Sequence, residues 1–465
     1  MVFSSLTFLY AYLPIVLAVY FLVPMRWRNF VLLVVSLFFY GWGEPVYVLI
    51  MIASIIINWL FGKTIAKYRK SDRKKAKTAL ILCMVFNLAL LGFFKYWDFL
   101  AENLNHLGLY LIRPLHLGLP IGISFYTFQT MSYPIDLYRF DTDPQDSLVS
   151  FGAYVCMFPQ LIAGPIVRYT DIAKQLNRRR LSANKFYDGI KRFMVGLSKK
   201  VLLANSAGQV YEAIAALPAA NQSAVTAWIG AICYTFQIYY DFSGYSDMAI
   251  GMGKMLGFDF LENFNYPYIS KTITEFWRRW HMSLSYWFRD YVYIPLGGNR
   301  CGLQRQIFNI MVVWLLTGFW HGASWNFVLW GVFYGIVLIL EKLFLLKWLK
   351  RAPNWVGHVY TMVLVILNWV IFANTDLAKG FAYIGAMFGA TGTFFNGLTL
   401  YYLRDNIVLL LICTIAATPI AATKWNFLRN RNGELLVPLL TVLGLLVCTA
   451  FIVDASYNPF LYFRF

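Results

Sequence analysis

Residues 306–340 read QIFNIMVVWLLTGFWHGASWNFVLWGVFYGIVLIL, a run without Asp, Glu, Lys or Arg. A helix needs roughly 20 apolar residues to cross about 30 Å of hydrocarbon, so this run is too long for one ordinary span. Gly318, Gly322, Gly331 and Gly335 offer places for the chain to bend. We therefore expect a membrane-embedded stretch that bends within its length.

The composition of the whole chain is also that of a membrane protein. Of its 465 residues, 59% are hydrophobic and 13% are charged, whereas soluble domains average about 45–50% and about 25%. So much apolar surface would aggregate in water, but a bilayer acts as its solvent. The predicted fold class is an all-α polytopic membrane protein, with residues 1–465 forming a single membrane domain.

Apolar runs along the chain predict about eleven or twelve transmembrane helices. Pro134, Pro159, Gly164 and Pro165 fall inside such runs and predict broken or re-entrant segments, which are tolerated where backbone lines a protein cavity. The segment Asp98–His116 is expected to be a connection outside the cytoplasm. The candidate runs are Phe8–Val23, Phe30–Tyr40, Val46–Phe61, Thr78–Tyr96, Leu119–Tyr138, Leu148–Val167, Val225–Tyr240, 306–340, Val359–Phe372, Phe381–Leu398, Ile407–Ala422 and Leu435–Ile452.

The formal charge of +18 is concentrated in loops. Lys63–Lys77 and Arg168–Lys200 both lie between apolar runs, as cytoplasmic loops do under the positive-inside bias, and Arg168–Lys200 has the spacing of amphipathic helices. With Arg26 and Arg28 on the same side, the N-terminus is predicted to be extracytoplasmic. Since no charge precedes Arg26, residues 1–24 are expected to be a retained first span rather than a secretory signal. No recognition motif accompanies the charge, so nucleic acid is not an expected partner.

His321 is the most informative of the five histidines. It lies near the middle of the charge-free run, where ionisable groups are costly and usually face a protein interior or a watery cavity. Imidazole is also the side chain best suited to proton transfer near neutral pH. Two interpretations stay open from position alone: a catalytic histidine, or a buried histidine that hydrogen-bonds between packed helices.

His281 lies in the polar, aromatic stretch that precedes this run. Glu275 is three and four residues before Arg278 and Arg279, so a helix with paired charges is plausible. The alternative is an interfacial amphipathic helix with an incidental histidine. Asp241 and Ser243, further upstream, fit either a loop boundary or the wall of a polar pocket.

Other site chemistries find little support in the sequence. We find no Walker-type glycine loop, no His-Glu-x-x-His and no Gly-x-Ser-x-Gly elbow. The six cysteines are scattered and suggest neither a zinc site nor a disulfide framework. No metal site is predicted, and no bound cofactor.

Seven segments, taken in order, resemble the alginate O-acetyltransferase branch of the membrane-bound O-acyltransferase family. The similarity runs over essentially the full length, and the ordered set is far more specific than any one motif. The segments are Met1–Ser5, Phe158–Pro165, Tyr240–Asp247, Asn263–Tyr268, Glu275–Arg300, Gly318–Trp330 and Tyr457–Phe465.

The resemblance implies an enzyme in which helices surround a central tunnel. Acetyl or another acyl group would pass from a cytoplasmic thioester, such as acetyl-CoA or a carrier-protein thioester, toward O-acetylation of an extracytoplasmic polysaccharide. The family's active-site histidine falls on His321, the expected general base, and its second functional histidine falls on His281. The acyl donor would dock at Arg168–Lys200, including Arg178–Arg180. The substrate-binding residues expected from these motifs are Asp241, Ser243, Arg278, Trp320, Ser324 and Asn326.

The resemblance also implies a setting and partners. The chain would be a multi-pass protein of the bacterial inner membrane, in contact with lipid, that works with a separate extracytoplasmic acetyltransferase. Alginate biosynthesis is the implied process, although the sequence does not choose among alginate, cellulose, peptidoglycan and another glycan as the final acceptor. The rival from another class is a transporter or lipid-carrier flippase with His321 in a substrate or proton path. A third hypothesis is that the chain is a non-catalytic scaffold for the partner acetyltransferase.

Overall fold

The computed structural model describes residues 2–162, 164–218, 221–454, 457–459 and 461. These residues form helices joined by loops, with no β-strand among them, so the predicted all-α class is confirmed. Contacts between Cα atoms separate two compact units, Met1–Phe193 with Tyr245–Glu262, and Met194–Gly244 with Asn263–Phe465. The single domain over residues 1–465 stays a prediction. Part of the Tyr457–Phe465 motif, and Met1 of the opening motif, lie outside the described residues.

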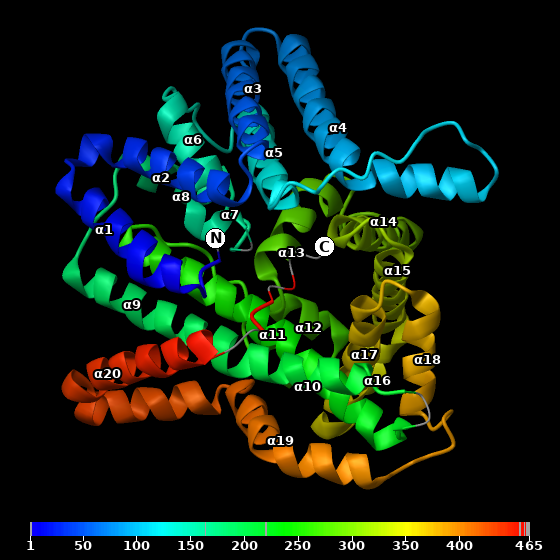
Figure 1. Cartoon of the computed structure of the whole chain (residues 1–465). Coiled ribbons are helices and arrows are strands. Elements are labelled where there is room, and N and C mark those ends of the chain that lie inside the picture. Colours follow the sequence, from blue (N-terminus) through cyan, green and yellow to red (C-terminus); the bar gives the residue numbers. More distant parts are fainter. Residues whose placement is uncertain (1, 163, 219–220, 455–456, 460, 462–465) are drawn as a thin grey trace. The chain divides into compact units, whose positions relative to one another are not determined.

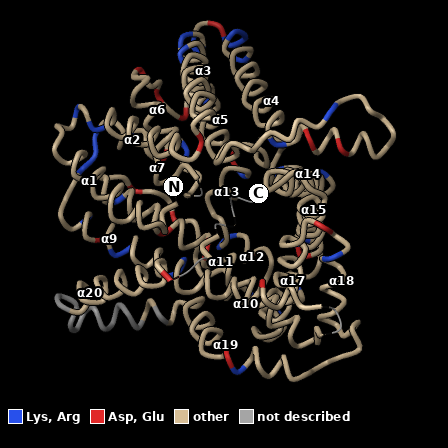
Figure 2. The backbone as a smooth tube through the Cα atoms, in the orientation of Figure 1, with Lys and Arg blue, Asp and Glu red and all other residues tan. Residues whose placement is uncertain are grey.

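The first unit is built around long apolar helices, two of which, α3 and α4, run side by side (Figure 1). Asp72 starts α4 by accepting a hydrogen bond from the backbone N–H of Lys75 at 3.0 Å. The basic cluster Lys63–Lys77 covers the end of α3, the turn and the start of α4 (Figure 2). The helices of this unit are η1 Phe8–Tyr12, α1 Leu13–Leu22, η2 Met25–Trp27, α2 Arg28–Gly43, α3 Tyr47–Tyr68, α4 Arg73–His106, α5 Ile123–Arg139, α6 Leu148–Cys156, α7 Phe158–Leu161, α8 Tyr169–Asn177, most of α9 Ala183–Ser198 and the end of α11 Ala224–Met255.

Two expectations for this unit need correction, and one is confirmed. Pro134 lies inside α5 and does not break it. Helix α4 continues to His106, so much of the expected connection Asp98–His116 is helical. The break near Pro159 is confirmed, because α6 ends at Cys156 and α7 starts two residues later with the proline in its first turn, where a missing N–H costs nothing.

The second unit contains the charge-free run, which forms a helical hairpin of α14 and α15. The break falls at Gly322, as a bend in this run predicts. Gly318 and Gly331 serve close packing instead, since a Cβ on them would lie 2.5 Å from Phe327 O and 2.4 Å from Trp314 O. The helices are the start of α11, η3 Lys199–Ala204, α10 Asn205–Ala215, η5 Pro267–Ile269, α12 Ile273–Arg279, α13 Met282–Phe288, η6 Arg289–Tyr293, α14 Leu303–His321, α15 Trp325–Leu340, η7 Glu341–Leu345, α16 Leu346–Leu349, α17 Asn354–Ala373, α18 Leu377–Met387, α19 Gly397–Ala416 and α20 Ile420–Asp454.

The predicted run Phe381–Leu398 is wrong as a single helix. Helix α18 ends at Met387 and α19 begins at Gly397. Between them Gly389 and Gly392 adopt φ angles of +87° and +73°, which favour glycine and turn the chain.

Six helices in the described residues are long and apolar enough to cross a membrane, and Phe8–Leu22 is a shorter apolar helix. In Gly397–Ala416 and in Leu436–Asp454, only 11% of the most apolar 18-residue stretch is buried within the protein. Side chains such as Val408 and Leu446 are 65% and 60% exposed, which in a folded protein indicates contact with lipid. The chain is a multi-pass membrane protein; the remaining spans of the predicted eleven or twelve stay a prediction. The six helices are Tyr47–Tyr68, Arg73–His106, Trp325–Leu349, Asn354–Ala373, Gly397–Ala416 and Leu436–Asp454.

Candidate active site

His281 lies at a sharp turn between α12 and α13 of the second unit. Its φ angle is 43°, in the left-handed region that few residues other than glycine adopt. The turn is held against the loop at Asn263, whose carbonyl accepts from the N–H of Met282 at 2.9 Å. The side chain of Asn263 completes the arrangement, because its Oδ1 lies 3.0 Å from Nδ1 of His281. Backbone and ring are therefore fixed by the same residue.

The contacts of Asn263 also select the tautomer of His281. Its Oδ1 accepts from the backbone N–H of Ser283 at 3.3 Å and from the Ser283 hydroxyl at 2.9 Å. A backbone N–H can only donate, so the atom that faces it is the amide oxygen, and His281 must donate to that oxygen from Nδ1. The lone pair of the neutral ring then lies on Nε2. Burial lowers the pKa of His281 from its ordinary 6.5 to about 3, so the ring is neutral near pH 7.

His321, the last residue of α14, lies in an aromatic cluster of the same unit. Its ring centroid is 5.0 Å from that of Trp320, 4.9 Å from that of Trp330 and 5.3 Å from that of Phe372. Trp320 also approaches His281, with ring centroids 5.9 Å apart. The two histidines are 5% and 1% exposed. The structure thus brings His281, Trp320 and His321 together, although 40 positions separate the histidines in sequence (321 − 281).

The other predicted site residues have different surroundings. Asp241 forms a buried ion pair with Lys200 at 2.7 Å and accepts from the N–H of Leu461 at 2.9 Å. Ser243, two residues further along α11, is buried as well. Asn326 donates to the carbonyl of Phe372 at 3.1 Å and so ties α15 to the end of α17.

Arg278 and Ser324 lie at the surface or close to it. Arg278 is exposed on α12, whereas Arg279 makes the ion pair that the sequence allowed for either, with Glu275 at 3.0 Å. Ser324 is half-buried and precedes α15 as its N-cap residue. Among the described residues, no group of three His, Cys, Asp or Glu side chains could hold a metal ion.

Two contributors to the site were not singled out in the sequence. Asn263 opened one of the quoted motifs, and a polar residue directly before the aromatic Phe264 was the only signal for it. Trp330 closes the Gly318–Trp330 motif and contacts His321. Neither contact follows from helical or strand periodicity, since both depend on how loops and helix ends meet.

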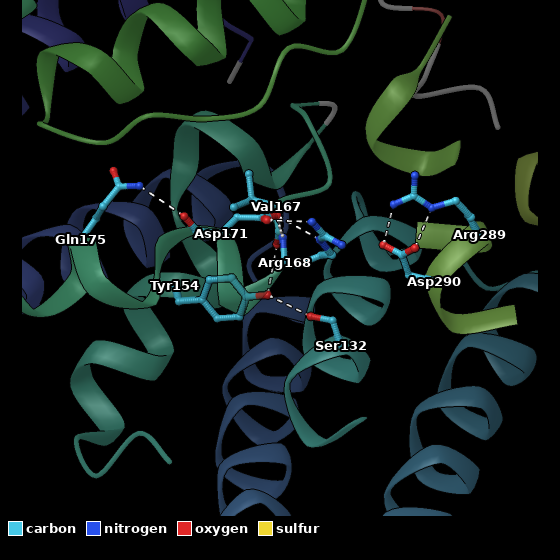
Figure 3. Close-up of polar contacts among 8 residues, drawn as sticks. All are labelled: Ser132, Tyr154, Val167, Arg168, Asp171, Gln175, Arg289 and Asp290. Atoms are coloured by element: carbon cyan, nitrogen blue, oxygen red, sulfur yellow. Dashed lines mark hydrogen bonds and ion pairs between the residues drawn. The ribbon is translucent and has the colours of Figure 1, made fainter. Parts of the chain in front are cut away.

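The basic stretch Arg168–Lys200 is less available to a ligand than its charge implies. Arg168 pairs with Asp171 at 2.9 Å in the first unit (Figure 3). Arg179 is buried, where its Nε donates to Tyr20 Oη at 2.6 Å and an Nη to Asn29 Oδ1 at 2.7 Å. The expectation that Arg179 faces a donor is therefore wrong. Lys174, Arg178 and Arg180 are exposed. Further ion pairs join Lys185 to Asp259, Lys191 to Asp188, and Arg192 to Asp247 and Glu262.

An all-helical, multi-pass chain with two buried histidines meeting at one tryptophan defines a membrane protein with an enclosed imidazole site. Residues 141–378, which include both histidines, match the model of MBOAT, the membrane-bound O-acyltransferase family. The chain belongs to this family.

Relatives of the chain agree with this assignment. The chain is 44% identical over 392 residues to the "probable alginate O-acetylase AlgI" of Pseudomonas aeruginosa. The aligned region covers 83% of this chain and 75% of the relative. It is 40% identical to the protein of that name from Pseudomonas putida over the full length of both. The peptidoglycan O-acetyltransferase of Helicobacter pylori is 33% identical over 84% of this chain and 80% of its own. The chain is an O-acyltransferase, as its resemblance to the alginate branch implied, and a transporter is no longer needed to explain its composition.

Proposed function

We propose that this enzyme moves an acetyl group from a cytoplasmic thioester, acetyl-CoA or a carrier-protein thioester, toward a polysaccharide outside the bacterial inner membrane. The observation that carries the proposal is the enclosed pair of imidazoles around Trp320. A hydroxyl is a poor nucleophile until a base removes its proton, and a neutral imidazole is suited to that task near pH 7. Aromatic walls around the ring of His321 exclude the water that would otherwise hydrolyse the thioester.

The proposed reaction requires one proton to be taken and returned. His321 accepts the proton of the acceptor hydroxyl as its oxygen attacks the thioester carbonyl. The C–S bond then breaks, and the thiolate leaves with the proton that His321 held. An ester and a free thiol are the products, so no oxidant, reductant or metal is required.

The tautomer of His281 limits what that residue does in this scheme. A neutral ring that donates from Nδ1 to Asn263 cannot donate from Nε2 to a developing oxyanion. It can accept a hydrogen bond from a substrate group, so we assign it to positioning. A second assignment, with His281 as the base, is favoured by the Asn263 contact, because a base oriented by a third group is a recurring catalytic arrangement.

Alginate is the acceptor polysaccharide that the relatives support best, since those at 40–44% identity are named alginate O-acetylases while the peptidoglycan enzyme is at 33%. A separate extracytoplasmic acetyltransferase would complete the transfer to the sugar. The exposed cations Lys174, Arg178 and Arg180 give the acidic donor an electrostatic docking surface.

The test uses the purified protein in nanodiscs with acetyl-CoA that carries a radiolabelled acetyl group, and with alginate oligosaccharides that supply the acceptor hydroxyl. We expect release of free CoA together with loss of label from the thioester, and the rate of both should fall by about 10²–10⁴-fold in His321→Gln. In the host cell, removal of the chain should lower the O-acetyl content of the envelope polysaccharide, measured by mass spectrometry. Uptake of label without thioester cleavage, after reconstitution of the protein into sealed vesicles, would contradict the proposal.

A further inference from the structure

Glu341 is a fully buried carboxylate at the end of α15 that accepts hydrogen bonds from the start of α12 and also interacts with Tyr360 of α17. One carboxylate oxygen accepts from the N–H of Ile273 at 2.7 Å. The other accepts from the N–H of Thr274 at 2.8 Å and from the Thr274 hydroxyl at 2.6 Å. The side chain is 0% exposed, and no cation lies within ion-pair distance of it among the residues that the structure describes. A negative charge in such a place needs compensation, which these donors supply.

The local helix geometry indicates that the contact is specific. Glu341 is the first residue of the π-helical segment η7, which follows α15 directly and departs from its regular α-helical turn. Thr272 already caps α12 by accepting from the N–H of Glu275 at 3.0 Å. The carboxylate of Glu341 therefore satisfies the two first-turn N–H groups that this cap does not reach.

Helix α12 is in contact with α15, and its other end leads into His281. Trp277 of α12 packs against Trp330 and Tyr334 of α15, with ring centroids 5.5 and 4.8 Å apart. Residues 330, 334 and 341 share a helical face by their spacing of four and seven. Trp330 in turn contacts His321 at 4.9 Å. These contacts form a continuous path between the two histidines. It runs from His321 through Trp330 and along α15 to Glu341, and from Glu341 along α12 to His281.

We propose that Glu341 is a positioning residue that fixes α12 against α15 and thereby sets the placement of His281 relative to His321. Helix α12 has only seven residues and cannot hold its register by its own backbone bonds. Its start is pinned by Glu341, its middle by Trp277, and its end by the turn at Asn263. Loss of the first of these contacts lets α12 shift, and a shift of about 1 Å at a reacting group can cost on the order of 10²-fold in rate.

The test is a double-mutant cycle between Glu341→Gln and His281→Gln, with acetyl transfer measured at saturating donor. Glutamine replaces one carboxylate oxygen by an N–H₂ group, which cannot accept a hydrogen bond from the donors of α12. The contact is therefore broken with little change in volume. Because Glu341 acts through His281, Glu341→Gln should lower kcat about tenfold or more in the wild-type background while the donor KM stays unchanged. In the His281→Gln background the same change should lower kcat less than about twofold.

Glu212→Gln is the matched control, since Glu212 is an exposed carboxylate of α10 and should leave kcat unchanged. Hydrogen exchange of the peptide that covers residues 271–280 should increase in Glu341→Gln and stay constant in the control. If Glu341→Gln fails to fold, Thr274→Val removes one of the three hydrogen bonds and replaces it in the cycle.

Equal losses of kcat in both backgrounds, or unchanged hydrogen exchange of α12, would overturn the inference. It rests on the proposed function, but the two fail differently. Wild-type activity in both histidine variants would refute the catalytic proposal. Inactive histidine variants beside a fully active Glu341→Gln would refute the role of Glu341 alone.

Discussion

The left-handed backbone conformation of His281 is energetically unfavourable, and contacts with the surrounding residues stabilise it. Such a conformation costs a residue with a Cβ about 1–3 kcal/mol and clusters at functional sites. Here the compensation comes from Asn263, which binds the turn through its backbone and the ring through its side chain. The strained residue lies where the chain changes direction, because only Trp280 and His281 separate the end of α12 from the start of α13.

Replacing Asn263 tests whether this support matters for catalysis. We expect Asn263→Ala to lower kcat by up to about 10²-fold, since His281 loses both its orientation and its fixed tautomer. Asn265→Ala is the control, because Asn265 contributes backbone hydrogen bonds to the same turn, from its N–H to Arg279 and through its carbonyl to the Arg279 guanidinium. Steady-state kinetics of both variants decide the matter; equal activity in the two would remove Asn263 from the mechanism.

The lowered pKa of His281 predicts a specific pH dependence of stability. The ring has a pKa of about 3 in the folded protein and about 6.5 when unfolded, so protons bind preferentially to the unfolded chain between these values. The stability that the neutral ring contributes is present above pH 6.5 and is lost as the pH falls toward 3. Thermal unfolding from pH 7 to pH 4.5 should therefore lower the Tm of the wild type more than that of His281→Gln. Parallel curves would show that the ring takes up a proton while folded.

The sequence pointed to both histidines because ionisable residues are scarce in apolar stretches, so each one stands out. It could not reveal what orients them. Asn263 is 18 positions before His281 and reaches it through a loop that folds back onto a turn. No spacing rule describes such a contact.

Among the elements, the α14–α15 hairpin shows how one residue type serves two purposes. Gly322 lies at the break, whereas Gly318 and Gly331 let the two helices approach each other. From the sequence all four glycines were equivalent candidates for bends. Proline was equally ambiguous, since Pro134 is accommodated within α5 while Pro159 starts α7. Local residue type marks where a helix can be interrupted, and tertiary packing decides whether it is.

The basic stretch makes a prediction at the scale of its helices α8 and α9. Arg178 and Arg180 are exposed beside the buried Arg179, so Arg178→Gln/Arg180→Gln should raise the KM for donor and weaken its salt dependence. Arg179→Gln should instead lower the Tm, because it removes a buried hydrogen-bond network with Tyr20 and Asn29. Kinetics at two ionic strengths and thermal unfolding separate the two effects. If the KM for donor is unchanged in Arg178→Gln/Arg180→Gln, the stretch is a topology signal only.

For the whole molecule, composition was sufficient to predict a polytopic helical membrane protein. The number of spans was harder to predict, because apolar runs such as Phe30–Tyr40 form helices that fall short of the length and hydropathy of the six candidate helices. Length and hydropathy of one segment identify long spans exposed to lipid, such as Gly397–Ala416. Helix α5, with 17 residues and several buried polar side chains, is not among the six, so the predicted span Leu119–Tyr138 stays a prediction.

The topology of the molecule is a prediction in its own right. Arg26–Arg28, Lys63–Lys77 and Arg168–Lys200 should all be cytoplasmic under the positive-inside bias. Single cysteines placed in each segment of a variant without native cysteines should react with an impermeant maleimide only after the membrane is opened. Labelling of any of the three segments in intact cells would invert or break the arrangement.

Acetyl transfer by His321→Gln tests the central claim most directly. Glutamine keeps the approximate volume and a hydrogen-bonding group but cannot take up a proton, so transfer should fall by about 10²–10⁴-fold in a protein that stays folded and monodisperse. His281→Gln should lose less if it positions substrate, and more if it is the base. Near wild-type transfer of labelled acetyl by well-folded His321→Gln would contradict the account.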